Sequence, residues 1–401
     1  MNLYKLINKY QLTKHGIVLI FVNLISTSLG FLSGAIIAAF LGPYARGVYQ
    51  AWRIFSNVFY DITNFGLSKF IASKFNIEST SFKGIFRHIT IVYLFVFALI
   101  PLMLYLNFSI TLISLFYILV PIGIFSDIYI GLLTRHGNYN IIALWNLISW
   151  AGGSIATILL FLIDKLSLES AIIANSSMAV LAFFFGKKNI DFPNGTISIY
   201  SHYRRILPIY FSNVFRTVFL FLDQVLVMLF LDLENLGIYS MALAVAGITT
   251  IATSSLNSIA PSIAKQKQHK KMKSHLQLFL IYLVIAILAV FFCRYFLPTI
   301  VAKTIGEVFL PIVSIVPIII VGNLLQSFVQ FQISWSIYEN DDKVLIIEKA
   351  VHAVSLVLAG LVFYHLRSIQ SAAWMIVFAH IPSFLFFAIL NLMNLRKVES
   401  E

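Results

Sequence analysis

The sequence LGPYARGVY at residues 41–49 returns as LDLENLGIY at residues 231–239, so one short segment occurs twice at an offset of 190 residues. Asn23 and Asn213 align at the same offset. Each copy forms a short break between two long apolar runs, and internal repeats of this size are typical of membrane transporters. The offset corresponds to six apolar runs, an even number. The two halves are therefore expected to cross the membrane in the same direction, as parallel repeats.

The apolar runs set the fold class. Apolar residues make up 60% of the 401 residues and charged residues 11%, whereas soluble domains contain roughly 45–50% and 25%. A helix of about 20 apolar residues spans a bilayer. Such runs occur at 16–41, 47–73, 88–106, 109–133, 140–163, 168–186, 206–231, 236–263, 276–298, 306–335, 344–364 and 370–394. The sequence thus predicts an all-α polytopic membrane protein with about twelve transmembrane helices, in six-helix lobes at 1–188 and 189–401.

Lysine and arginine residues are spread unevenly over the segments between these runs. With the N-terminus in the cytoplasm, 19 fall in cytoplasmic segments, five in external segments and four inside helices. Cytoplasmic loops carry the excess of positive charge in membrane proteins, so both termini are expected in the cytoplasm. The basic cluster Lys265–Lys273 is expected to bind anionic membrane lipids, and no nucleic acid partner is expected.

The second run carries polar residues on one face, at spacings of 3, 4, 4, 3 and 4: Gln50, Arg53, Asn57, Asp61, Asn64 and Ser68. They fall within an arc of roughly 80° and extend over about 27 Å of helix, nearly the whole hydrocarbon thickness. A charge that faces lipid at mid-bilayer costs at least roughly 2.5–3.5 kcal/mol. This face is therefore expected to point into a water-filled substrate cavity or, alternatively, into a buried network between helices.

The corresponding run of the second half carries a similar set: Asn213, Arg216, Asp223 and Gln224. Neither Arg53 nor Arg216 has an acid one turn away on its own helix, so each guanidinium needs an anion on another helix or on a ligand. The candidate protein partners are Asp61, Asp127 and Asp223. Asp61 and Asp223 are also candidates for ion coupling, because acids inside a membrane mark ion and proton pathways.

Other intramembrane polar residues extend the predicted cavity: Asn23 in the first run, and Asn323, Gln326 and Gln330 in the tenth. The hydroxyl residues between Thr249 and Ser258 either join the cavity or pack between helices.

Glu348 and His352 lie at positions i and i+4 of one run, which makes them a candidate proton relay for ion coupling. Glu348 also lies near the cytoplasmic end of its run, and a solvated end residue is the favoured interpretation. No metal-ligand cluster and no nucleotide-binding glycine loop occurs in the sequence. We therefore expect no metal, no cofactor and no enzymatic reaction.

Four motifs extend over the chain: FLGP at 40–43 with GVY at 47–49, NFGLS at 64–68, GLLTRHG at 131–137, and LDQVL at 222–226 with LGIYSMA at 236–242 and PSIA at 261–264. Together they resemble the polysaccharide-transport branch of the multidrug, oligosaccharidyl-lipid and polysaccharide flippase superfamily, as in bacterial O-antigen flippases. The resemblance implies two six-helix lobes around a central cavity that opens alternately to the two sides of the bacterial inner membrane.

The resemblance also implies the substrate, an undecaprenyl-pyrophosphate-linked oligosaccharide that moves from the cytoplasmic to the periplasmic leaflet. Arg53 and Arg216 match the family's basic cavity residues by helix position, and the planar guanidinium suits phosphate. Lipopolysaccharide biosynthesis with a polysaccharide polymerase and a chain-length regulator as partners would follow. This sequence departs from a strongly cationic cavity, because its three intramembrane aspartates outnumber the two arginines.

The alternative function is that of an ion-coupled multidrug exporter of related architecture. Such a cavity needs aromatic rings and acids for organic cations, whereas the amide and arginine stripes favour sugars. A membrane polymerase or glycosyltransferase would need long external loops, and the external segments here are short.

The predicted topology can be tested by labelling single cysteines in a variant without Cys293, the only native cysteine. We expect cysteines at positions 190, 268 and 340 to react from the cytoplasm and those at 44, 166 and 367 to react from outside, because of the distribution of positive charge. Labelling of position 268 by an impermeant reagent added to intact cells would contradict this orientation.

Overall fold

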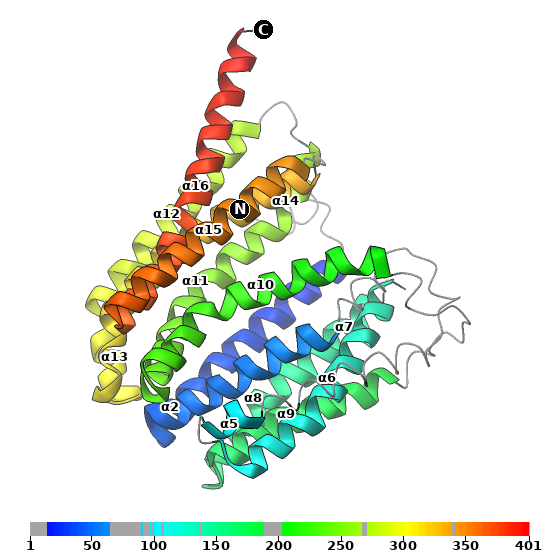
Figure 1. Ribbon diagram of the computed structural model, residues 1–401, viewed down its shortest axis with the longest axis vertical. Helices are drawn as coiled ribbons and strands as arrows, with labels where there is room; N and C mark the ends of the chain where they lie inside the picture. Colours follow the sequence, from blue (N-terminus) through cyan, green and yellow to red (C-terminus); the bar gives the residue numbers. More distant parts are fainter. Residues whose placement is uncertain are drawn as a thin grey trace. The chain divides into compact units, whose positions relative to one another are not determined.

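The computed structural model describes residues 14–64, 90, 97, 100–105, 108–135, 138–187, 203–266, 271–338 and 342–400. Within these ranges the regular elements are all helical (Figure 1). They are α2 (Lys14–Asn64), α5 (Ile100–Tyr105), α6 (Ile110–Arg135), α7 (Tyr139–Asn146), the π-helical turn η2 (Leu147–Ala151), α8 (Gly152–Leu162), α9 (Leu168–Lys187), α10 (Tyr203–Phe230), α11 (Leu233–Gln266), α12 (Lys271–Tyr295), α13 (Leu297–Thr304), the 3-10 turn η5 (Glu307–Phe309), α14 (Ile312–Tyr338), α15 (Asp342–Leu366) and α16 (Ile369–Ser400).

These helices follow the predicted apolar runs closely, and the prediction of an all-α, multi-pass membrane protein is confirmed. Among the described residues, seven helices are long and apolar enough to cross a membrane, or eight if α12 and α13, bent by 57°, form one broken span. Helix α2 counts once in that number although it contains the first predicted run and residues 47–64 of the second. The third predicted run, 88–106, lies largely outside the described residues.

Helix α2 bends at the first copy of the repeat. Gly42 has φ 81° and ψ 176°, which is not a helical conformation. A positive φ of this size suits glycine because it has no Cβ atom. The next residue, Pro43, has no backbone N–H to donate to the preceding turn. The break predicted at residues 41–47 is therefore a bend centred on one residue, with helix on both sides.

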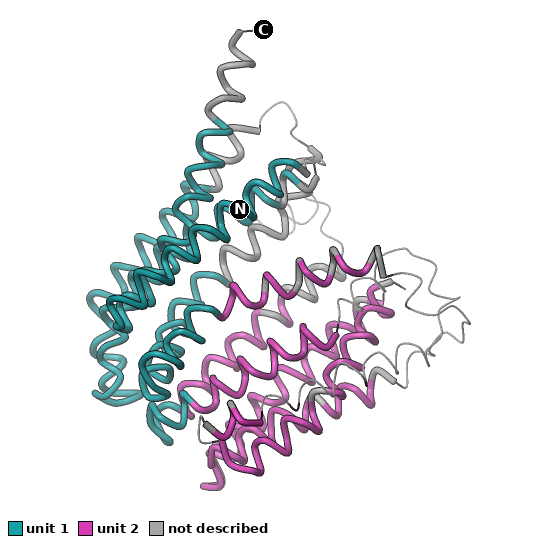
Figure 2. The backbone as a smooth tube through the Cα atoms, in the orientation of Figure 1, with its two compact units in different colours: residues 1–13, 38–47, 222–401 teal, residues 14–37, 48–221 magenta. Residues whose placement is uncertain are grey.

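The chain forms two compact units (Figure 2). Unit 1 contains residues 1–13, 38–47 and 222–401, and unit 2 contains residues 14–37 and 48–221. Helices α2 and α10 each contribute to both units. The lobes predicted at 1–188 and 189–401 are a different division of the chain, and they stay a prediction.

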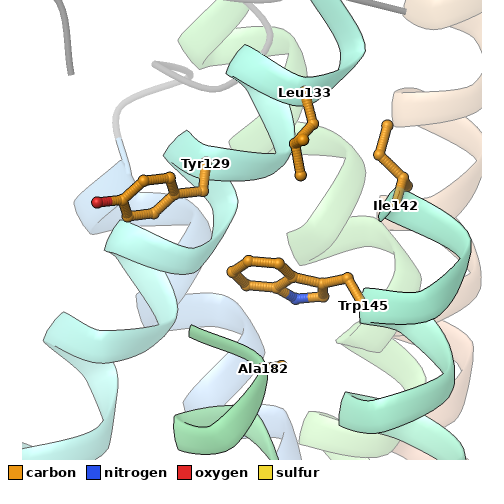
Figure 3. Close-up of a cluster of buried hydrophobic side chains, with 5 residues drawn as sticks. All are labelled: Tyr129, Leu133, Ile142, Trp145 and Ala182. Atoms are coloured by element: carbon orange, nitrogen blue, oxygen red, sulfur yellow. The ribbon is translucent and has the colours of Figure 1, made fainter. Parts of the chain in front are cut away.

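Unit 2 has an aromatic core where α6, α7 and α9 meet. Its buried members are Tyr129, Leu133, Ile142, Trp145 and Ala182 (Figure 3). Phe183 packs edge-on against the Tyr129 ring, with 5.7 Å between the ring centroids. Because Trp145 and Tyr129 come from different helices, their large apolar surfaces hold α7 against α6.

In unit 1, helix α15 exposes its apolar face and buries its polar face. Val354, Val357, Leu358 and Leu361 are 55–59% exposed, and they form one face at helical spacing. Glu348, Ser355 and Ala359 are buried on the opposite face. A soluble protein would place these faces the other way round, so the exposed face of α15 is suited to lipid.

The two copies of the repeat pack backbone against backbone inside unit 1. A Cβ atom on Gly47 would overlap the carbonyl group of Leu233, and a Cβ atom on Gly237 would overlap the carbonyl group of Pro43. These two Cβ atoms would also lie 3.1 and 2.9 Å from the backbone nitrogen of the other glycine. Pro43 and Leu233 occupy equivalent repeat positions, as do Gly47 and Gly237. The contact is therefore reciprocal, and it requires glycine on both sides.

We predict that Gly47→Ala and Gly237→Ala each lower the thermal unfolding midpoint of the detergent-purified protein. Overpacking usually costs about 1–3 kcal/mol, and a rigid backbone has less freedom to move than a side chain. The matched control is Gly247→Ala in α11, where an added Cβ atom meets nothing within 4 Å. Equal unfolding midpoints for the Gly237→Ala and Gly247→Ala variants would contradict the close backbone contact.

Candidate functional site

The polar stripe predicted on the second run lies on α2, in the part of the helix that belongs to unit 2. Gln50 and Asn64 are buried, whereas Arg53, Asn57 and Asp61 are half-buried. Ser68 lies outside the described residues. The face is thus partly enclosed by protein along the described length of the stripe.

Arg53 is the basic residue of this face. Within the described ranges it makes no ion pair and no hydrogen bond through its guanidinium group, while the nearby acids bond neutral partners. A half-buried guanidinium in a membrane needs water or an anion. This geometry leaves the planar fork of Arg53 available for a phosphate or carboxylate group.

Two acids of unit 2 lie in a polar cluster formed by Tyr60, Asp61, Asn64, Asp127 and Thr217. The Thr217 hydroxyl of α10 donates to the Asp61 carboxylate of α2. The Asn64 amide of α2 donates to the Asp127 carboxylate of α6, and the Tyr60 hydroxyl also bonds Asp127. The cluster therefore links three helices through two carboxylates and their neutral donors.

Asp223 occupies a comparable place in unit 1. It is 7% exposed and accepts a hydrogen bond of 2.7 Å from the Tyr239 hydroxyl group. That hydroxyl also lies 3.3 Å from the carbonyl oxygen of Ala372. Asp223 thus connects α10 with α11, and through Tyr239 with α16. Gln224, predicted to face the cavity, is buried in the same unit.

The predicted stripe of the tenth run lies on α14. Asn323 is half-buried, and its amide lies 3.3 Å from the carbonyl oxygen of Ala246 on α11. Gln326 is half-buried and Gln330 is exposed. On α11 the hydroxyl groups of Thr249 and Thr250 bond carbonyl groups of their own helix, which is the geometry of packing residues. Side chains of Asn23, Asn213 and Arg216 lie outside the described part of the structure.

The favoured interpretation of Glu348 as a solvated end residue is wrong. Its side chain is 1% exposed, and it pairs with Lys349 at 3.2 Å. Its neighbour His352 is half-buried and stacks on His380 of α16, with ring centroids 4.8 Å apart. The burial has a physical cause: α15 packs its polar face against α16 and turns its apolar face outward.

Sequence reasoning missed several residues of these clusters. Thr217, Tyr60 and Tyr239 act as donors to acids, but nothing in a single sequence links them to an acid on another helix. His380 could have been identified from the sequence, because an ionisable residue in the middle of an apolar run is itself a functional candidate. Arg46 lies in a segment that the charge distribution places outside the membrane, yet its side chain is 4% exposed within unit 1.

No family model matches the sequence, and no curated protein matches it. Solved structures with the same fold do match. The inward-facing conformation of a multidrug resistance MATE family transporter of the MOP superfamily gives a TM-score of 0.71 at 14% identity, covering 93% of this chain and 96% of that one. The lipid II flippase MurJ in an inward closed conformation gives a TM-score of 0.69 at 15% identity, covering 93% of this chain and 87% of that one.

A third match is a MOP superfamily transporter from Pyrococcus furiosus, for which a reversed polarity of the binding pocket has been taken to suggest a different function. It gives a TM-score of 0.58 at 15% identity and covers 96% of both chains. At these identities the likeness concerns the fold. The chain has the fold of MOP superfamily transporters, and its side chains must carry any argument about the substrate.

We predict that Thr217→Val destabilises the protein by about 1–3 kcal/mol, because it removes a donor to the half-buried Asp61 carboxylate while it keeps the side-chain shape. In an Asp61→Asn background the same change should cost much less, and thermal unfolding of the four proteins of this double-mutant cycle measures the difference. Thr134→Val is the matched control in unit 2, since the Thr134 hydroxyl bonds only the Ile130 carbonyl of its own helix. If Thr217→Val destabilises the wild type and the Asp61→Asn protein equally, the hydrogen bond between Thr217 and Asp61 is contradicted.

Proposed function

We propose that this protein is a flippase that moves undecaprenyl-pyrophosphate-linked oligosaccharide repeat units, such as those of O-antigen, across the bacterial inner membrane. The transfer runs from the cytoplasmic to the periplasmic leaflet by alternating access. Both termini lie in the cytoplasm in this proposal. A polysaccharide polymerase and a chain-length regulator are the expected partners, because they would consume the flipped repeat units.

The observation that carries the proposal is Arg53, half-buried on the amide-rich face of α2 and without an acidic partner in the part of the chain that the structure describes. Gln50 and Asn57 flank it at helical spacing. A pyrophosphate linkage offers the anion that the guanidinium lacks, and amides are suitable donors and acceptors for sugar hydroxyl groups. The fold shared with the lipid II flippase MurJ supports a lipid-linked substrate.

In this proposal the residues divide into two roles. Arg53 and Arg216 bind the anionic carrier group, and the amides Asn23, Gln50, Asn57, Asn64, Asn213, Gln224, Asn323, Gln326 and Gln330 contribute to the cavity. Asp61 and Asp223 are the proposed coupling acids, one in each unit. Each already accepts a hydrogen bond from a neutral hydroxyl group. Such a carboxylate can exchange a proton or bind a cation without first breaking an ion pair.

The second candidate function is an ion-coupled multidrug exporter. The likeness to the MATE family transporter favours it as much as the likeness to MurJ favours a flippase. A drug exporter that takes organic cations would have no use for an unpaired arginine on its polar face, because like charges repel. We prefer the flippase for that reason.

We predict that Arg53→Ala inserts at a normal level but abolishes surface polysaccharide in a strain that lacks the native gene, and that Arg216→Ala does the same. Arg53→Lys should restore export only in part, since lysine keeps the charge without the bidentate fork. Polysaccharide is measured by gel and by surface staining, with protein level on an immunoblot.

Arg294→Ala is the matched control, because Arg294 is an exposed arginine at the end of α12. Normal polysaccharide in both the Arg53→Ala and Arg216→Ala strains would reject the proposed binding role. Drug sensitivity of the deletion strain with unaltered polysaccharide would favour the exporter instead.

A further inference from the structure

A group of ionisable residues lies between α15 and α16 and has no role in the transport proposal above. Glu348 and His352 come from α15, and His380 and Ser383 come from α16. Glu348 is 1% exposed, His380 is 8% exposed and Ser383 is fully buried. Burying ionisable side chains in a membrane protein is costly, and such residues usually have a function there.

The two imidazole rings are in direct contact. Their centroids lie 4.8 Å apart and their planes are inclined by 25°, so the rings are stacked. His352 also hydrogen-bonds the backbone of Ala379, the residue that precedes His380. In the described part of the chain, Nδ1 of His380 and Oγ of Ser383 are buried without a hydrogen-bond partner. His380 thus has a free ring nitrogen inside the protein.

The depth of the rings follows from helix geometry. His352 lies ten residues into α15 and His380 eleven residues into α16, which corresponds to roughly 15 Å along each helix at 1.5 Å per residue. The hydrocarbon layer is about 30 Å thick. Helices α15 and α16 are consecutive and cross the apolar layer in opposite directions. Both imidazoles therefore lie near the middle of this layer.

Glu348 interacts with two side chains that can carry a positive charge. Its Oε2 lies 3.2 Å from the Nζ of Lys349, whose side chain is 61% exposed. His352 lies one helical turn further along the same face and interacts electrostatically with both Glu348 and Lys349. Protonation of His352 would create a second, more deeply placed cation beside the same carboxylate. Helix α14, which packs against both α15 and α16, contains no Asp, Glu, Lys, Arg or His.

We propose that Glu348, His352 and His380 form a proton-binding site between α15 and α16, in which a ring nitrogen of one of the two stacked imidazoles takes up one proton and Glu348 balances its charge. When the site is unprotonated, Lys349 neutralises Glu348. When a proton enters, the charged imidazole takes over that role, and Glu348 no longer needs Lys349. A metal ion is a poorer candidate ligand, because the described residues contain no group of three His, Cys, Asp or Glu side chains arranged to hold one.

The test uses the full-length protein, labelled with ¹⁵N-histidine and reconstituted in lipid nanodiscs without substrate. Proton binding is followed by NMR between about pH 5 and 8, the range in which histidine normally titrates. We expect the His352 and His380 signals to change together in the wild type. In His352→Gln the midpoint of His380 should shift by about one pH unit or more, because interacting groups titrate as a pair. His365→Gln is the matched control, since His365 is an exposed histidine at the end of the same helix.

Lys349→Gln gives a second test at an exposed position where the protein should fold normally. Loss of the competing ammonium should move the shared midpoint to higher pH, because Glu348 is then free to balance the protonated imidazoles. The proposal is overturned if neither histidine titrates in this range, or if His380 titrates identically in the wild type and in His352→Gln. Because no substrate is present, these results do not depend on the proposed flippase activity, which the polysaccharide assay tests separately.

Discussion

The close contact between Pro43–Gly47 and Leu233–Gly237 is the constraint on which unit 1 depends. Two backbones meet there with no side chain between them. A side chain at either glycine would hold the two backbones apart, so the bend of α2 and the start of α11 can meet only because both positions are glycine. It also explains why residues 38–47, which precede most of unit 2 in the sequence, belong to unit 1.

Fold class and the positions of most described helices could be predicted because they depend on local properties. A run such as 344–364 is apolar enough to specify a helix without knowledge of its neighbours, and α15 occupies Asp342–Leu366. The site was harder to predict. The spacing of Arg53, Asn57 and Asp61 identifies a polar face, but it does not say which helix lies opposite. The bonds from Thr217 to Asp61 and from Asn64 to Asp127 join residues that are 156 and 63 positions apart, and nothing in their local sequence relates them.

Glu348 shows the limit of reasoning from position alone. A residue near the end of an apolar run is usually in contact with water, and that rule failed because the buried face of α15 is set by α16. Three aspartates of this protein nonetheless follow one physical rule. Asp61, Asp127 and Asp223 are each bonded by hydroxyl or amide donors from another helix, which lowers the cost of an acid inside the membrane. Each such bond also fixes two helices to each other.

The division of α2 between the two units has a consequence for how the protein is made. Gly47 leaves the ribosome 186 residues before Leu233, and at roughly 5–20 residues per second that is a wait of about 10–40 s. During this interval the first helix is already in the bilayer, but residues 38–47 lack the partner segment against which they finally pack. The close backbone contact at this bend therefore cannot form until the second copy of the repeat has been made. A ribosome that stalls before residue 233 would leave a membrane-inserted product with an unfinished first unit, and such a product is a natural target for membrane proteases.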